Sequence, residues 1–257
     1  MQPQFERLTD DQWKVIEHFL NCERKRKYAL REIMNAILWL TRTGCQWRNL
    51  DRSFPPWESV YYYFVKWGKD GTWELMCQSL NMVERIQLDR EPTPSLGFVD
   101  SQSVKLSPMI FECRGVDGNK KINGRKRQIL VDVLGRLWKV KVHAAHQHDS
   151  PEGVGLLDDL AEQLPRLKKI MGDKSYRGTF AQAVEKLGLI FEVPLREDGV
   201  RGFVVEAKRW VVERSFAWLN FFRRVVVDYE HTPQSAQSFL LLANISIVIW
   251  RIDCSKL

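Results

Sequence analysis

The sequence has few cysteines, and they lack the spacing that structural cysteines need. The 257 residues contain five, scattered and never arranged as Cys-x-x-Cys: Cys22, Cys45, Cys77, Cys113 and Cys254. Disulfide frameworks and zinc ribbons both depend on regularly spaced, even sets of cysteines. The pattern therefore excludes both classes and is typical of a protein from a reducing compartment.

Long apolar runs are also missing. The most apolar stretch, residues 239–250, is interrupted by Asn244 and Ser246. It is shorter than the roughly 20 residues that a membrane-spanning helix needs, so it predicts a buried helix. Residues 1–7 lack the apolar segment of a signal peptide. We therefore expect a cytoplasmic protein that does not associate with a membrane.

The sequence has no excess of acidic residues; basic residues outnumber them. The chain has 39 Lys and Arg against 32 Asp and Glu, a formal net charge of +7. Its 44% hydrophobic and 28% charged residues exclude a disordered chain and suffice for one large domain or two modest ones. The positive charge favours a polyanionic partner, of which nucleic acid is the first candidate.

The first ninety residues carry the signals of successive helices. Thr9 can cap a first helix, and Gly44 can end a second that begins near Tyr28. Pro55-Pro56 precedes a third helix starting at Trp57, and Thr72 can cap a fourth that reaches about Arg85. We interpret residues 1–88 as an all-α, helix-turn-helix-like DNA-binding domain.

A plain helical bundle is the alternative interpretation of this region, with its tyrosines and tryptophans in the core. The three consecutive tyrosines 61–63 cannot all face inward. We therefore expect at least one to be exposed, and Tyr62 is the candidate for a DNA contact. Two prolines and no periodicity mark residues 89–95 as a linker to a second domain, residues 96–257.

The second domain changes from helical to strand patterns. The expected strands are 96–100, 128–133, 137–143, 168–173 and 189–193, and the expected helices are 150–163, 180–187 and 209–224. Three consecutive strands form a meander, and strand–helix–strand units then add parallel strands. This order predicts a ribonuclease-H-like α/β fold, a mixed five-stranded sheet with flanking helices. Its first and fourth strands are neighbours.

Carboxylates end these two neighbouring strands. Asp100 follows the first strand and Asp173 the fourth, while Glu213 lies on the helix expected to pack across their ends. Each residue alone could have a structural role. Asp100 could cap a turn, Asp173 could accept hydrogen bonds from loop amides, and Glu213 could form an ion pair with Arg209. Together they would repel unless a cation neutralised them. All-oxygen clusters suit two Mg²⁺ (or Mn²⁺) ions, which can cleave phosphodiesters.

Basic residues surround this proposed site. The stretch 115–127 is glycine-rich and carries five cations in eight residues, so we expect a loop that contacts the DNA backbone; a solvated hairpin tip is the alternative. The full set of candidate DNA contacts is Tyr62, Lys105, Lys120, Lys121, Arg125, Lys126, Arg127, Tyr176, Arg177, Arg209, Arg223 and Arg224. Trp210 and Trp218 are expected in the core.

A group of histidines offers a second, weaker metal-site interpretation. His143, His146, His148 and Asp149 lie close in sequence, at the end of a strand and in the following loop. They lack the helical His-x-x-x-His spacing of zinc enzymes, and Asp149 is better placed to cap the next helix.

Six segments, in order through nearly the whole chain, resemble bacterial insertion-sequence transposases of the DDE class, in family five of the IS4/IS5-like superfamily. The segments are Leu8–Trp13, Pro55–Phe64, Val99–Lys105, Lys120–Arg127, Gly172–Gly178 and Arg209–Asn220. The resemblance implies that Asp100, Asp173 and Glu213 are the catalytic, metal-binding triad. It also implies that the N-terminal helices help to recognise terminal inverted repeats.

The resemblance further implies the activity. We expect an enzyme that binds inverted repeats, cleaves DNA with Mg²⁺ and joins the 3′-hydroxyl to target DNA, working as a homodimer on bacterial DNA. Hairpin-forming relatives carry Tyr and Lys where this chain has Glu206 and Asn220, so a hairpin step is not implied. A structure-selective nuclease and a DNA-binding regulator without turnover are the alternatives.

Overall fold

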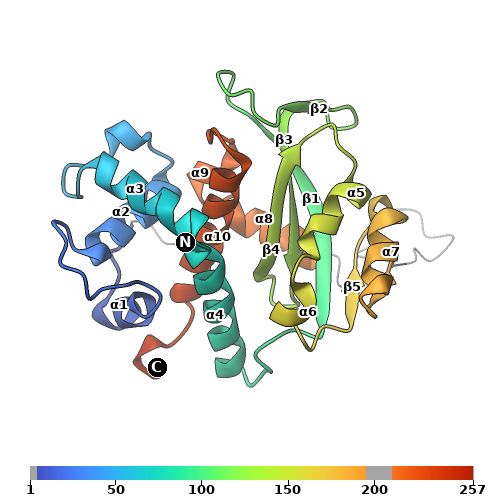
Figure 1. The fold of residues 1–257 in the computed structure, drawn as a ribbon, viewed down its shortest axis with the longest axis horizontal. Helices are drawn as coiled ribbons and strands as arrows, with labels where there is room; N and C mark the ends of the chain where they lie inside the picture. Colours follow the sequence, from blue (N-terminus) through green and yellow to red (C-terminus); the bar gives the residue numbers. More distant parts are fainter. Residues whose placement is uncertain (1–4, 195–209, 257) are drawn as a thin grey trace.

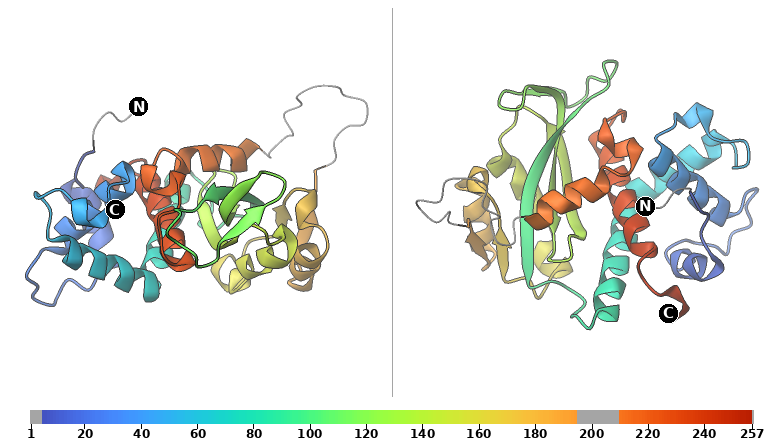
Figure 2. Two further views of the ribbon diagram at one scale, coloured as in Figure 1. Left: turned by 90° about the horizontal axis from the view of Figure 1, so that it is seen from above. Right: turned by 180° about the vertical axis from the view of Figure 1, so that it is seen from behind.

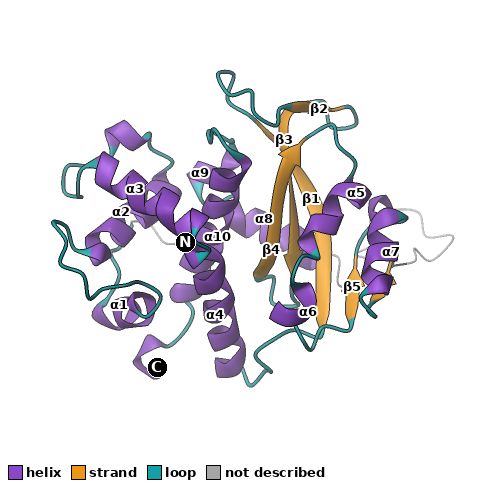
Figure 3. Cartoon of the chain, viewed as in Figure 1, coloured by secondary structure: helices purple, strands orange, loops and turns teal. Residues whose placement is uncertain are grey.

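The computed structural model describes residues 5–194 and 210–256, in which a mixed sheet stands beside a group of helices (Figure 1). The strands gather in one part of the molecule with helices on both sides (Figure 3). One face of the sheet packs against α5 (Asp149–Gly153) and α7 (Thr179–Lys186). The other faces α8 (Trp210–Leu219) and α10 (Pro233–Ile249), beyond which lie the N-terminal helices (Figure 2).

The N-terminal helices begin and end close to the predicted residues, except that Thr72 is the first residue of its helix, with Gly71 as the N-cap, and does not cap it. They are α1 (Asp10–Glu17), α2 (Leu30–Thr43), α3 (Trp57–Lys69) and α4 (Thr72–Gln87), with a 3₁₀ turn at Trp47–Asn49. The Thr9 hydroxyl accepts the Gln12 backbone N–H at 3.2 Å, and Gln12 Oε1 accepts the Thr9 N–H at 3.0 Å. This capping box starts α1. Gly44 ends α2 in a left-handed conformation (φ 72°), as expected.

The five expected strands have the predicted order, and the described sheet contains a sixth strand that was not predicted. Its strands are β1 (Leu96–Lys105), β2 (Gly115–Asp117), β3 (Ile122–Val131), β4 (Leu137–Ala144), β5 (Lys169–Met171) and β6 (Ile190–Glu192). β3 pairs antiparallel with β1 on one side and with both β2 and β4 on the other, while β5 and β6 continue the sheet parallel to β1. The meander followed by parallel strands confirms the ribonuclease-H-like α/β fold.

Four element predictions were wrong. The strand expected over 96–100 continues to Lys105, so Asp100 does not end it. Residues 115–127 do not form one loop, because β2 and the first half of β3 lie there and pair with each other. Residues 150–163 are not one helix: α5 gives way to a 3₁₀ turn at Val154–Leu156, and Asp159, left-handed at φ 55°, precedes the separate α6 (Leu160–Gln163). The helix expected over 209–224 ends at Leu219, and extended Phe222 precedes α9 (Arg223–Val226).

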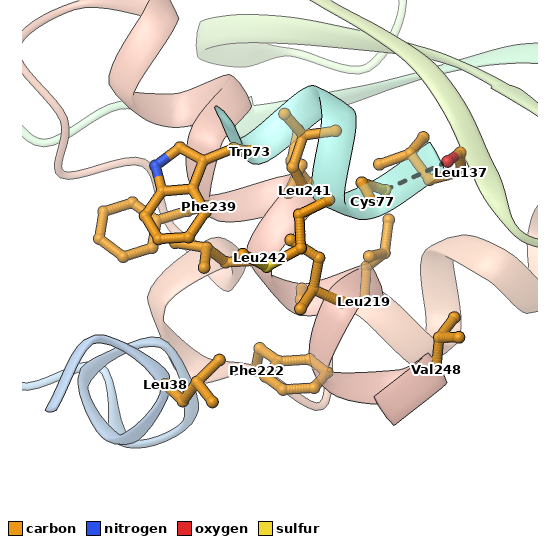
Figure 4. Packing of buried hydrophobic residues seen from close by; sticks show 14 of the residues in the cluster. Leu38, Trp73, Cys77, Leu137, Leu219, Phe222, Phe239, Leu241, Leu242 and Val248 are labelled. Atoms are coloured by element: carbon orange, nitrogen blue, oxygen red, sulfur yellow. Dashed lines mark hydrogen bonds between the residues drawn. The ribbon is translucent and has the colours of Figure 1, made fainter. Parts of the chain in front are cut away.

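Apolar side chains join the N-terminal helices to the sheet. Figure 4 shows Trp73 of α4 and Phe239 of α10 close together, with Leu219 of α8 in the same cluster. Cys77 Sγ donates to the Leu137 carbonyl at 3.4 Å. The apolar run near the end of the chain is thus the buried helix α10, as predicted. The cluster spans both sides of the loop 88–95, and the division into two domains stays a prediction.

Buried ion pairs add a polar link between α4 and the β3–β4 hairpin. Arg85 Nη1 lies 2.6 Å from Asp132 Oδ2, and Arg136 Nη2 lies 2.6 Å from Glu84 Oε1. All four side chains are at most 6% exposed. Such pairs fix the position of α4 on the hairpin, because an unpaired charge there would be costly. None of the helices in ranges 5–194 and 210–256 is long and apolar enough to span a membrane.

Candidate active site

Asp100, in the middle of β1, and Asp173, two residues after β5, lie side by side on neighbouring parallel strands. The β1–β5 register pairs Phe98 with Met171, and each aspartate comes two residues later in its own strand direction. Both line a small cavity of about 20 Å³, to which α8 contributes Val212. A cavity of this size has room for a single water. The two carboxylates predicted to meet at this edge are therefore neighbours.

Local sequence sets the orientation of each aspartate. A Cβ at Gly172 would come 2.7 Å from Val99 Cγ1, so only glycine lets the end of β5 approach β1 this closely. Asp173 Oδ1 accepts the Ser175 N–H at 2.9 Å, and Asp100 Oδ1 accepts the Ser101 N–H at 2.7 Å. Both carboxylates are half-buried, oriented by the backbone and open to the cavity.

Tyr176 packs behind the two aspartates. Its side chain is fully buried and meets the Phe180 ring edge-on at 5.1 Å. Burial raises the pKa of Tyr176 well above its ordinary value, and the charges of Asp149, Asp100 and Asp173 raise it further. The phenol therefore stays protonated. The predicted DNA contact by Tyr176 was wrong, because no part of the side chain reaches the surface.

Glu213 is exposed on α8, directly after the Val212 that lines the cavity. The helix lies across the sheet (Figure 2) and buries the apolar side chains Val211, Val212, Phe216 and Leu219. Ser215 Oγ also donates to the Gly135 carbonyl at 3.0 Å. Arg209, the predicted partner of Glu213, and Glu206 lie outside the described residues.

The oxygen chemistry of this edge fits Mg²⁺ or Mn²⁺, since the charged side chains among the described residues that line the cavity are the carboxylates Asp100 and Asp173. Within ranges 5–194 and 210–256, no three acidic, histidine or cysteine side chains lie close enough to hold a metal. The structure thus brings Asp100 and Asp173 together and places Glu213 on the adjoining helix. The joint binding of a metal by all three remains a prediction.

The histidine alternative has no geometric support. His143 Nδ1 contacts the Ala144 carbonyl at 3.0 Å, which requires it to donate, and Nε2 then accepts from Gln128 Nε2 at 3.0 Å. Both ring nitrogens are therefore engaged, and burial lowers the pKa of His143. Asp149 begins α5 without capping it through its side chain, contrary to expectation, and the N-cap is His148.

Arg127 fastens α8 to the sheet. Its Nε donates to Gln102 Oε1 on β1 at 2.9 Å, its Nη2 to Asn220 Oδ1 at 2.8 Å and its Nη1 to the Val225 carbonyl at 2.7 Å. Burial lowers its pKa to about 10. Arg127 therefore connects the strand of Asp100, two residues before Gln102, with the end of the helix that carries Glu213.

Three more predicted DNA contacts are buried and bonded within the chain. Arg125 Nη1 donates to the Glu230 carbonyl at 2.8 Å, and Lys126 Nζ donates to the Gln147 carbonyl at 2.9 Å. Arg224 Nε donates to Glu230 Oε1 at 2.8 Å. Like Arg127, these side chains are at most 8% exposed. Their assignment to a DNA-binding surface was wrong, because their charges are used inside the fold.

The other candidate contacts lie on the surface. The side chains that are exposed are Lys105, Lys120, Lys121, Arg177 and Arg223, together with Tyr62, which is 60% exposed. Trp210, expected in the core, is also exposed, at 45%. The sequence carried a signal for this that the prediction missed: Trp210, Arg214 and Trp218 recur every four residues, which places them along one side of α8.

The strand order and the paired aspartates define a protein of the ribonuclease-H-like class. A family model described as transposase DDE domain matches residues 91–249, and a second, described as putative transposase of IS4/5 family, matches residues 8–77. The chain belongs to the DDE transposase family, as the resemblance predicted. The predicted membership of the IS4/IS5-like group is likewise confirmed.

Two individual proteins show how far the similarity extends beyond these family models. The chain is 30% identical over 73 residues to an uncharacterized protein, y4sN, of Sinorhizobium fredii (strain NBRC 101917 / NGR234). The match spans 27% of this chain and 58% of the length of that protein. Among solved structures, it is similar to the catalytic core domain of BIV integrase, with 14% identity and a TM-score of 0.36 over 59% of this chain and 82% of that one.

Proposed function

We propose that this protein is a DNA transposase that binds the terminal inverted repeats of an insertion sequence, cleaves DNA at the element end and joins the 3′-hydroxyl to target DNA. The observation that carries the proposal is the pairing of Asp100 and Asp173 at one sheet edge beside the Glu213 helix, in a chain of the DDE transposase family. The active form is a homodimer that works on DNA in the bacterial cytoplasm.

Asp100, Asp173 and Glu213 are the proposed ligands of two Mg²⁺ or Mn²⁺ ions. Bound there, such ions would activate a water or 3′-hydroxyl and stabilise the leaving oxygen. The chain itself supplies the orientation: backbone N–H groups hold the two aspartates, and Arg127 holds the end of α8. The triad needs these supports because three carboxylates without a cation repel one another.

The exposed cations are the proposed contacts for the DNA backbone. Lys120 and Lys121 lie at the tip of the turn between β2 and β3, and Arg177 follows Asp173 by four residues. Lys105 ends β1, the strand of Asp100. Such cations bind phosphates regardless of sequence, so the net charge of +7 supports a DNA substrate without specifying its sequence.

Recognition of the inverted repeats is assigned to the N-terminal helices. The exposed Tyr62 of α3 lines a surface hollow whose other polar lining residues are Tyr61, Lys66, Lys69, Glu58 and Asp70. Lys66 is paired with Asp70 at 2.6 Å. An exposed tyrosine pair with neighbouring lysines can contact base edges and phosphates together.

The test is a strand-transfer assay with a pre-cleaved element end, a supercoiled plasmid and Mg²⁺. The proposal predicts plasmid joined covalently to the labelled end, and no product when EDTA replaces Mg²⁺. A structure-selective nuclease would cut the DNA without joining it, and a regulator would bind without cutting. Either of these two outcomes, with DNA carrying the matched repeats, would contradict the proposal.

A further inference from the structure

Arginine and tryptophan side chains alternate along α8 on a side of the helix that the catalytic assignment does not use. The Arg214 guanidinium lies between two rings, 4.2 Å from the Trp210 centroid and 4.5 Å from that of Trp218. Arg251, which follows α10, lies 4.7 Å from the Trp218 ring. We call Trp210, Arg214, Trp218 and Arg251 the Arg–Trp ladder. It begins on the helical turn that carries Glu213.

The ladder carries positive charge that the surrounding acids do not neutralise. Arg136 also approaches Trp218, at 5.4 Å, but Glu84 pairs with it, and Asp132 pairs with Arg85. Among the described residues, no carboxylate forms an ion pair with Arg214 or Arg251. Burial lowers the pKa of Arg214, and the like charges of Arg136 and Arg251 lower it further.

Two donors in this cluster have no acceptor. Within ranges 5–194 and 210–256, neither Arg214 Nε nor Arg136 Nη1 has a hydrogen-bond partner, although both atoms are buried. A buried guanidinium donor without an acceptor costs free energy. The cluster thus holds concentrated positive charge next to the flat ring of Trp210, which is 45% exposed.

A cavity lies at the far end of the ladder. It has a volume of about 380 Å³, and its lining includes Trp218, Phe221, Phe222, Trp250, Arg42 and Arg251. Of the described residues in this lining, Glu6 is the one that is acidic. The volume is in the range of small-molecule sites. Trp218 comes eight positions after Trp210 on the helix, a distance of about 12 Å along the axis at 1.5 Å per residue.

We infer that the Arg–Trp ladder binds a single strand of DNA, with bases stacking on Trp210 and phosphates bound by Arg214 and Arg251. Alternating cations and aromatic rings suit this ligand because each nucleotide brings one anion and one flat ring. The strand follows α8 from the Glu213 turn towards the aromatic cavity. This inference rests on the proposed function for its place in the reaction, since it assigns the path of the strand beside the cleavage site.

The experiment measures binding of a fluorescein-labelled single-stranded oligothymidylate by anisotropy, in EDTA and over a series of salt concentrations. Trp210→Ala and Arg214→Gln are each expected to weaken binding about tenfold. Loss of a phosphate contact should also reduce the slope of log K against log salt by about 0.7 in Arg214→Gln. Trp210→Ala should leave that slope unchanged, and Trp210→Phe should restore most of the affinity.

Phe111→Ala is the matched control, because Phe111 is 75% exposed and lies 5.8 Å from the Arg114 guanidinium on another part of the surface. It should bind like the wild type. Three results would overturn the inference. The control could lose as much affinity as the ladder variants, both ladder variants could bind with wild-type affinity, or the wild-type chain could fail to bind the oligothymidylate. If Arg214→Gln lacks a cooperative thermal transition, the exposed Arg251→Gln takes its place with the same expectation.

Because no metal is present, this result does not depend on catalysis. A wild-type chain that binds the oligothymidylate through the ladder but neither cleaves nor joins DNA would contradict the proposed function and leave the ladder assignment standing.

Discussion

Asp100→Asn is expected to lower Mg²⁺-dependent cleavage of a duplex bearing the element end by about a thousandfold or more. The metal ions contribute several kcal/mol of transition-state stabilisation, and each 1.36 kcal/mol is a factor of ten. Asparagine keeps the oxygen that accepts the Ser101 N–H, so the fold and the binding of DNA ends should persist. Cleavage rates on gels and binding by mobility shift give the two readouts.

Asp253→Asn is the matched control for this experiment. Asp253 Oδ1 accepts the Ser255 N–H at 3.2 Å, which repeats the Asp-x-Ser turn of Asp173 at a position after α10. The control should cleave at the wild-type rate, while Asp173→Asn should be as inactive as Asp100→Asn. Cleavage by Asp100→Asn at the control rate would refute the assignment of this carboxylate.

Asp132→Ala is expected to destabilise the protein by about 3–5 kcal/mol, the cost of leaving one member of a buried ion pair alone. The Asp132 side chain is 0% exposed and lies 2.6 Å from Arg85. It also accepts the backbone N–H groups of Leu134 at 2.9 Å and Arg136 at 3.1 Å, which close the β3–β4 turn. Urea denaturation monitored by tryptophan fluorescence gives the free energy of unfolding.

The comparison for this variant is Asp11→Ala. Asp11 pairs with Lys14 at 3.1 Å, with both side chains at least half exposed. Removing a pair of this kind costs about 0–1 kcal/mol. A loss for Asp132→Ala no larger than that for Asp11→Ala would show that the buried link between α4 and the hairpin does not stabilise the fold.

Local patterns in the sequence predicted much of the fold and the pairing of Asp100 with Asp173. The runs that precede Asp100 and Asp173 are apolar because their strands are covered by helices on both faces. The signals at Thr9 and Gly44 depend only on residues within one helical turn. Such short-range chemistry can be read without knowing the tertiary structure.

The basic residues of β3 could not be assigned in this way. Arg125 and Arg127 look like a surface patch beside Lys126, but their acceptors lie about a hundred positions later, at Glu230 and Asn220. Only the folded chain brings these acceptors to β3. The end of the helix predicted over 209–224 also depends on distant residues. The helix stops at Leu219, and Asn220 and Val225, which follow it, accept hydrogen bonds from Arg127 on β3.

Glu213 is the member of the proposed triad that lies outside the cavity lining, whereas Asp100 and Asp173 both line it. The most direct measurement is the Mg²⁺-dependent cleavage rate of Glu213→Gln on element-end DNA, beside Glu185→Gln on the exposed surface of α7. The account predicts a loss of about a thousandfold for Glu213→Gln and none for Glu185→Gln. Wild-type cleavage by Glu213→Gln, under conditions where Asp100→Asn is inactive, would contradict it.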